Sequence, residues 1–318
     1  MQLRMINKMK FITYIAVCLF LMVSTHSIAQ QTPLYSQYMF NDFVINPAVA
    51  STYDYYQIRS TNRFQWVGIK DAPVTNILSV YGPNKTGPWG WGATVYSDNQ
   101  GPTGKTGGYL SYAYYIKIYK DIKLSFGLSM GLTQFKIDET KITFENTEPG
   151  LLQNKYTYLT PDATSGLYLY NSKSFIGFSA DQLFQNKLAI SYNNVAPRID
   201  SINRLKSHFT VVTGTKMSLN REYEFEPTLL FRATGESAPQ VEATARIIFN
   251  KAVWLGATYR SSDAVSILAG YVYKEKIYIG YAYDITYSRL RVSSGGTHEV
   301  MVGARFNKIR TSSGARYR

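Results

Sequence analysis

The chain has 318 residues, of which 17% are charged and 15% aromatic, and its formal net charge is +13. The basic residues are scattered and form no helical stripe, which argues against a nucleic-acid-binding protein and favours attraction to anionic lipid head groups. The single cysteine, Cys18, lies in an apolar N-terminal run that we expect to be removed. The mature chain would then have neither disulfides nor thiolate metal sites.

The N-terminus has the pattern of a secretory signal peptide. Basic residues precede an apolar run over 11–23, and the small residues Ser27 and Ala29 predict cleavage before Gln30. The apolar run is too short for a retained membrane helix, which needs about 20 residues. We therefore expect a signal peptide over 1–29, a periplasmic segment over 30–52, an outer-membrane barrel over 53–306 and a basic tail over 307–318.

Strict alternation is the main feature of the mature chain. Between Ile122 and Leu132 every second residue is apolar, and the residues between them are polar or small. This is the pattern of a strand with lipid on one face and a polar lumen on the other. Fourteen such segments follow one another at 53–62, 74–82, 89–98, 107–118, 121–136, 163–170, 174–181, 206–217, 222–232, 240–249, 252–260, 264–273, 275–285 and 297–306. We predict an all-β, transmembrane, antiparallel up-and-down β-barrel of about fourteen strands.

The connections between these segments alternate in length. Short turns at 119–120, 171–173, 218–221, 250–251 and 274 alternate with mostly longer connections, of which 137–162, 182–205 and 286–296 are the largest. Barrels of the outer membrane have short periplasmic turns and long external loops. This pattern places both termini on the periplasmic side. Two features are exceptions: Pro227 predicts a bulge within its strand, and the connection 82–88 is long for a periplasmic turn.

The charges of the second half share one face of their strands. With Leu229 and Phe231 outward, the inward residues are Glu222, Glu224, Glu226, Arg232, Glu242 and Arg246. Either an ion-selective channel or a lumen cross-braced by paired charges explains this cluster, and we favour the second. The final strand ends on an outward aromatic, Phe306, which resembles the C-terminal signal of outer-membrane barrels. The basic tail beyond it is either a lipid-touching segment or a docking segment for a periplasmic partner.

The mature sequence has no pattern typical of catalysis. Only His208 and His298 remain after cleavage, and neither has a ligand or nucleophile partner at useful spacing. The glycine-rich stretch at 87–92 contains tryptophans at a strand start, so we interpret it as a packing feature. We expect no catalytic, cofactor-binding or metal site.

Several motifs, in order along the chain, resemble those of the PorP/SprF family of type IX secretion membrane proteins. They are QTPLYSQYMFN at 31–41, INPA at 45–48, RFQWVG at 63–68, APVT at 72–75, DNQGP at 98–102, WLGATYR at 254–260 with DA at 263–264, GYAYD at 280–284 and GTHEV at 296–300. The resemblance covers essentially the whole mature chain and is weakest in the connection 137–162. It implies an outer-membrane protein of type IX secretion and gliding. The implied partners are the C-terminal domain of a secreted adhesin, other secretion components and outer-membrane lipids.

Three functions remain open from the sequence. The first is a non-enzymatic partner that binds a secreted adhesin domain at the cell surface, for which Arg63, Gln65, Trp66, Arg260 and Asp284 are the candidate binding residues. The first three are predicted in the first external connection and the last two near external strand ends. The alternative for these residues is fold maintenance, with Trp66 as an interface aromatic and Arg260 paired to Asp284 at the rim. The second function is a passive or substrate-selective pore, and the third, which we favour least, is a lipid-modifying barrel enzyme.

Overall fold

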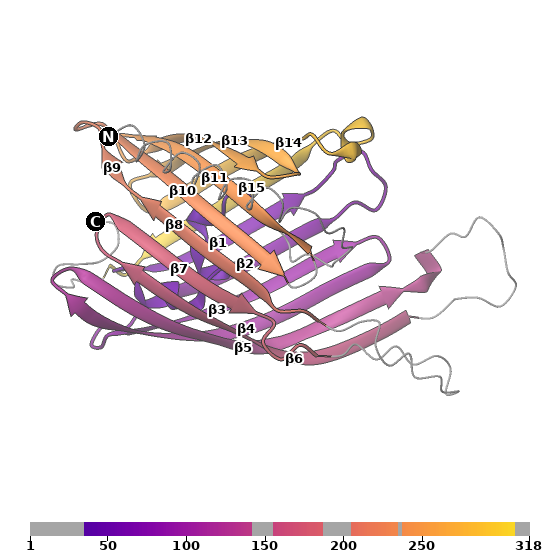
Figure 1. Cartoon of the computed structure of the whole chain (residues 1–318), viewed down its shortest axis with the longest axis horizontal. Coiled ribbons are helices and arrows are strands. Elements are labelled where there is room, and N and C mark those ends of the chain that lie inside the picture. Colours follow the sequence, from indigo (N-terminus) through magenta and orange to yellow (C-terminus); the bar gives the residue numbers. More distant parts are fainter. Residues whose placement is uncertain (1–34, 142–154, 187–204, 235–236, 309–318) are drawn as a thin grey trace, which may run out of the picture.

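The computed structural model describes residues 35–141, 155–186, 205–234 and 237–308, which fold into one closed antiparallel sheet (Figure 1). The predicted signal peptide and most of the tail lie outside these residues. The strands are β1 (Tyr56–Phe64), β2 (Val74–Pro83), β3 (Trp89–Gln100), β4 (Thr103–Tyr119), β5 (Ile122–Asp138), β6 (Lys155–Tyr170), β7 (Ser174–Asp181), β8 (His208–Thr215), β9 (Met217–Ser218), β10 (Tyr223–Thr234), β11 (Ser237–Phe249), β12 (Val253–Arg260), β13 (Ala264–Tyr273), β14 (Ile277–Thr286) and β15 (Thr297–Phe306).

Apart from the short β9, each strand pairs with its neighbours along the chain, and the pairing of β1 with β15 closes the ring. The two-residue β9 continues the edge of β8 along β10, so the wall contains fourteen full strands. All fourteen predicted strands are therefore confirmed, and the fold is an antiparallel up-and-down barrel. Within the described residues no helix has the length and apolar character needed to cross a bilayer.

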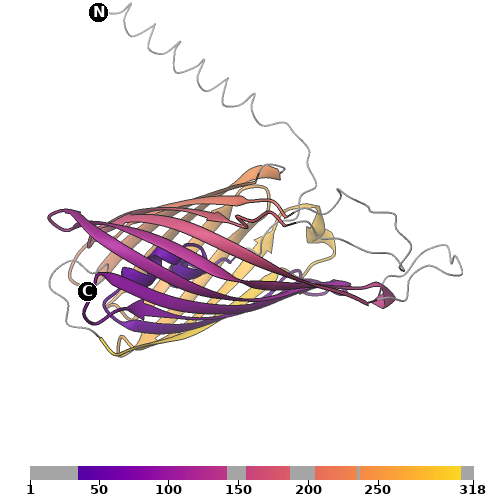
Figure 2. The ribbon, with the colours of Figure 1, turned by 90° about the horizontal axis from the view of Figure 1, so that it is seen from below.

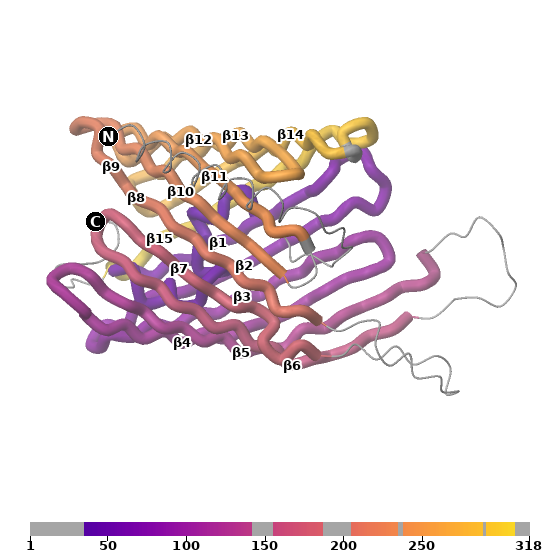
Figure 3. Tube along the Cα trace, viewed as in Figure 1, coloured from indigo at the N-terminus to yellow at the C-terminus, as the bar shows by residue number. Residues whose placement is uncertain are grey.

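The outer face carries the predicted apolar band. On β5, Phe126, Leu128, Met130 and Leu132 are all exposed, whereas Ser125 on the opposite face is buried in the lumen. The alternating stretch from Ile122 to Leu132 has eleven residues, which matches the 9–11 residues with which a strand crosses a membrane. β5 and β6 stay paired well beyond it, as far as Asp138 opposite Lys155, so this part of the wall extends beyond the rest of the barrel (Figure 3).

The two ends of the barrel differ in their connections. At the end where β15 finishes, on the left in Figure 1, tight turns join β4 to β5, β6 to β7 and β13 to β14. The opposite end carries the connections 65–73 and 287–296, the second of which contains η5 (Arg289–Val292). By the rule of short periplasmic turns, the first is the periplasmic end and the second the external end.

The bulge predicted at Pro227 is wrong. The register between β10 and β11 runs unbroken through Pro227 opposite Ala245, and the shift lies instead between Arg232 and Thr234. On its other edge, β10 is unpaired between Phe225 and Thr228, where β8 gives way to β9. A residue without an N–H is tolerated where the ladder is already interrupted, so no bulge forms at Pro227.

The N-terminal segment lies inside the barrel, where three single turns, η1 (Tyr38–Phe40), η2 (Asp42–Val44) and η3 (Pro47–Ser51), pack against the inner wall (Figure 2). We call residues 35–52 the plug. The sequence predicts a periplasmic segment here, and for these residues that position is incorrect. The apolar side chains of the plug, among them the fully buried Ala48, Val49 and Ala50, pack with luminal residues such as Tyr81 and Ala113, and this removes them from water.

Candidate functional site

Glycines on the inner wall make room for the plug. A Cβ at Gly127 of β5 would lie 2.1 Å from the backbone nitrogen of Ala48, and one at Gly90 of β3 would lie 2.3 Å from the carbonyl oxygen of Ala50. Neither approach is compatible with any side chain. The absence of side chains at these two positions of β3 and β5 lets η3 pack directly against the backbone of the wall.

Asn46 links the start of η3 to the wall. Its Oδ1 accepts a hydrogen bond from the Ala48 N–H at 3.0 Å, and its Nδ2 donates to the carbonyl oxygens of Leu167 and Phe178, each at 3.0 Å. Pro47 occupies the first position of the turn, where its missing N–H is not needed. The Ile-Asn-Pro-Ala motif at 45–48 thus forms the contact between plug and barrel.

The middle of the plug is held by rings and hydroxyls. Phe43 stacks on Tyr81 with ring centroids 4.5 Å apart, and Phe40 packs against Trp254 at 4.3 Å. The Ser79 hydroxyl donates to Asn41 Oδ1 at 2.8 Å. These contacts come from β2 and β12, which lie five strands apart around the ring, while η3 packs against β3 to β6. The plug therefore contacts the wall on several sides of the lumen.

An ionic cluster holds the first described residues of the plug near the external end of the lumen. The Glu299 carboxylate accepts the backbone N–H groups of Ser36 and Gln37, both at 2.8 Å. Arg63 bridges Glu299 and Asp284 with distances of 3.0 and 2.7 Å. The Ser36 hydroxyl donates to Asp284 and accepts from Arg63 at 2.9 Å. This cluster joins β1, β14 and β15 to the plug.

Arg260 completes the cluster from β12. Its guanidinium lies 3.2 Å from Asp284, 3.3 Å from Glu242 and 3.1 Å from Asp263. Both arginines and the carboxylates of Asp284, Glu299 and Glu242 are no more than 1% exposed. Removing one member of such a cluster leaves an opposite charge buried without a partner, which is strongly destabilising. The cluster therefore ties the plug firmly to the wall.

The structure brings together three of the five candidate binding residues. Arg63, Arg260 and Asp284 belong to this one cluster. Two positions are corrections: Arg63 lies in β1 and not in the external connection, and the Arg260–Asp284 pair lies within the lumen and not at the rim. These side chains are turned inward because the parity of their strands places them on the luminal face.

The other two candidates, Gln65 and Trp66, lie in the connection between β1 and β2 and are partly exposed. Trp66 adopts a left-handed backbone conformation with φ of 46°. Its N–H donates to Thr297 Oγ1 at 3.1 Å, and the Gln65 N–H donates to the Pro73 carbonyl at 2.9 Å. The connection is thus tied to the start of β15 and presents its side chains at the external mouth.

Sequence reasoning missed Glu299 and Ser36 as members of the cluster. Glu299 could have been found from parity, since it alternates with the outward residues Val300 and Val302 of the same strand. No local pattern pointed to Ser36, because its partners Glu299 and Asp284 lie more than 200 residues away in the chain.

The luminal charges of the second half are cross-braced, as predicted. Arg246 pairs with Glu226 between β11 and β10, and Lys216 pairs with Glu224 at 2.7 Å. The His298 ring hydrogen bonds to the Tyr281 hydroxyl at 2.6 Å. The paired-charge interpretation of this cluster is therefore confirmed for these residues.

A closed wall of fourteen antiparallel strands, with an apolar outer band and a lumen filled by its own N-terminal segment, defines an outer-membrane β-barrel protein. The chain belongs to the family described as type IX secretion system membrane protein PorP/SprF, whose model matches residues 27–304. The resemblance drawn from the motifs is thereby confirmed, and the protein is located in the bacterial outer membrane.

Several solved structures are similar to this chain. A Pseudomonas aeruginosa FadL homologue aligns with a TM-score of 0.47 and 11% identity. The alignment covers 88% of this chain and 96% of the homologue's chain. The CymD monoaromatic hydrocarbon channel also has a TM-score of 0.47, with 9% identity over 90% of this chain and 95% of its own. The Acinetobacter baumannii outer membrane protein Omp33 has a TM-score of 0.41, with 8% identity over 81% and 99%. No curated protein matches the sequence.

Proposed function

We propose that the protein is a non-enzymatic outer-membrane component of type IX secretion and gliding that binds the C-terminal domain of a secreted adhesin and helps to export or retain it at the cell surface. The observation that carries this proposal is the filled lumen. With residues 35–52 packed across the barrel, recognition is directed to the external mouth and its connections. Family membership supports the assignment to the secretion system.

The binding surface of the proposal is the external mouth beside β1 and β15. Gln65 and Trp66 present partly exposed side chains there, and exposed tryptophans are frequent anchors of protein interfaces. Arg63, Arg260 and Asp284 act from beneath by tying the ends of β1, β12 and β14 to the plug. In this role they position the mouth and make no contact with the partner.

The filled lumen also favours this function over the passive pore. Two of the cavities left between the plug and the wall, of about 560 Å³ and about 160 Å³, share no lining residue. The plug packs between them, so this proposal takes it to hinder the passage of ions. We therefore expect the protein to give little conductance in planar bilayers.

Affinity purification from native outer membranes tests the proposal. The tagged protein should recover a large secreted adhesin, identified by mass spectrometry. A variant with Gln65→Ala and Trp66→Ala should lose it, because the proposed anchor is gone. Exposed turn residues at the periplasmic end, Lys85→Ala and Lys173→Ala, form the matched control. A partnerless barrel that conducts ions would contradict the proposal and support the pore.

A further inference from the structure

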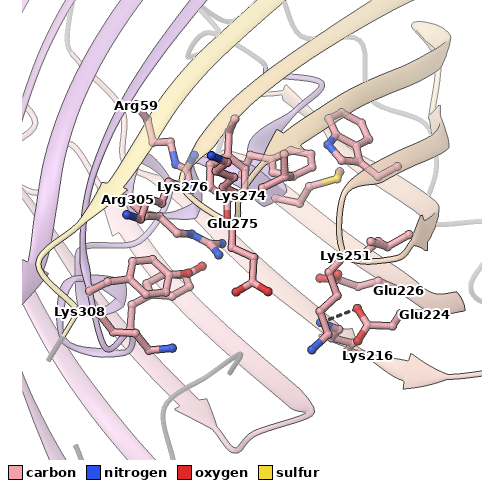
Figure 4. Close-up of a pocket in the computed structure, with 18 of the residues that line it drawn as sticks. Arg59, Lys216, Glu224, Glu226, Lys251, Lys274, Glu275, Lys276, Arg305 and Lys308 are labelled. Atoms are coloured by element: carbon pink, nitrogen blue, oxygen red, sulfur yellow. Dashed lines mark ion pairs between the residues drawn. The ribbon is translucent and has the colours of Figure 1, made fainter. Parts of the chain in front are cut away.

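The larger cavity, of about 560 Å³, opens at the periplasmic end of the barrel (Figure 4). It lies between the inner wall and the lower face of the plug, where Met39, Phe40 and Trp254 form an apolar floor. Around its opening stand lysines of the turns, namely Lys251, Lys274 and Lys276. This is a deep, partly apolar pocket with a basic rim, on the side opposite to the proposed adhesin surface.

Two arginines that line this cavity have no carboxylate partner among the described residues. Arg59 is 1% exposed, and its Nε and Nη1 have no hydrogen-bond partner among the described residues. Its Nη2 donates to Gln57 Oε1 at 2.8 Å. Arg305 comes from the adjacent strand β15, and no ion pair is found for either arginine in the described part of the chain. A buried guanidinium with free donors is a strong binding group for an anion.

The two guanidiniums are held in place by aromatic rings. Arg59 lies 4.0 Å from the ring centre of Tyr278, and Arg305 lies 4.3 Å from the same ring and 4.3 Å from that of Tyr55. A Cβ at Gly303 would come within 2.5 Å of Arg59 Nη1, so this glycine provides the space for the side chain. The wall is therefore built to hold two like charges close together, an arrangement that favours a bound anion.

The acidic residues that line the cavity do not neutralise these cations. Glu224 is paired with Lys216, and Glu226 with Arg246. Glu275 is the remaining carboxylate among the lining residues, and no ion pair is found for it among the described residues; Figure 4 shows its side chain extending into the cavity. The cavity thus has a clear excess of positive charge next to an apolar floor.

We infer that this cavity binds an acidic peptide segment of a periplasmic protein. The Arg59 and Arg305 guanidiniums receive a carboxylate, the rim lysines attract further acidic side chains, and the floor accepts an apolar one. A single small anion would contact only the arginine pair, whereas the lysines are distributed around the opening, which suits a chain with several carboxylates. The volume lies within the range typical of ligand pockets.

Fluorescence anisotropy with the full chain in detergent micelles tests this inference. The probe is a fluorescein-labelled peptide of six glutamates and two phenylalanines, and its control replaces each glutamate by glutamine. The double variant Arg59→Gln with Arg305→Gln should lower the affinity at least about tenfold, because charge-assisted hydrogen bonds are lost. Lys251→Gln with Lys276→Gln should lower it several-fold. Lys85→Gln with Lys173→Gln, at the same end but outside the cavity, should leave it unchanged.

Sodium chloride should weaken binding of the glutamate peptide, and the glutamine peptide should not bind. Equal affinity for the arginine double variant and the wild type would overturn the inference, provided that both proteins keep the electrophoretic heat shift of a folded barrel. Tight binding of inorganic phosphate or phosphatidylglycerol micelles without binding of the peptide would overturn it in favour of a phosphate ligand. These outcomes do not depend on whether an adhesin binds at the external mouth.

Discussion

The two ends of the lumen each contain a pair of arginines, and the surroundings of the two pairs are opposite. At the external end, Arg63 and Arg260 face the carboxylates of Asp284, Glu299 and Glu242. At the periplasmic end, Arg59 and Arg305 face aromatic rings and open space. The arginines at the external end, whose charges are balanced by carboxylates, hold the plug. In our inference, the arginines at the periplasmic end, whose charges are not balanced, bind a ligand.

The largest expected effect comes from removing a charge at the balanced end. Arg260→Ala leaves Glu242 buried without a cation and weakens the environment of Asp284, so we expect a loss of about 3–5 kcal/mol in the free energy of unfolding. Urea unfolding in detergent measures it. Arg221→Ala, in an exposed turn, is the control and should change stability by less than about 0.5 kcal/mol. A small effect of Arg260→Ala would show that the cluster does not hold the fold.

A change in the wall tests the plug itself. Gly127→Leu places a side chain where Ala48 lies, so we expect the plug to be displaced, stability to fall by about 1–3 kcal/mol, and conductance in planar bilayers to rise. Gly108→Leu is the control because a Cβ at Gly108 meets only ordinary contact, with Val95 at 3.7 Å. If Gly127→Leu raises conductance no more than Gly108→Leu does, the lumen is not closed by the plug at this point.

The smallest expected effect sharpens the comparison. Arg59→Gln removes one of two like charges and its contact with Tyr278, and these changes oppose each other. We expect a change of less than about 1 kcal/mol in the free energy of unfolding, measured in urea beside Arg63→Gln, which should cost several times more. Equal losses for the two variants would remove the distinction between the ends.

The predictability of the fold follows from how its strands are stabilised. A strand between lipid and lumen must alternate, so the positions of β5 and β10 and the outward direction of Phe231 are visible in the sequence. Pro227 was misjudged because its effect depends on the neighbouring strand, which is interrupted opposite to it. For the candidate site, the residue types were predicted, but the exposure of Arg63, Arg260 and Asp284 was not.

The sequence by itself determined the strand order, the parity of the wall, the end at which the long connections lie and the family of the chain. Each of these depends on residues close together along the chain or on motifs of short range. Only the tertiary structure decided that residues 35–52 fill the lumen. Ser36 meets Glu299 across 263 positions, and no periodicity encodes such a contact. Closing the ring of strands creates the interior in which the plug, its ionic cluster and the basic cavity come together.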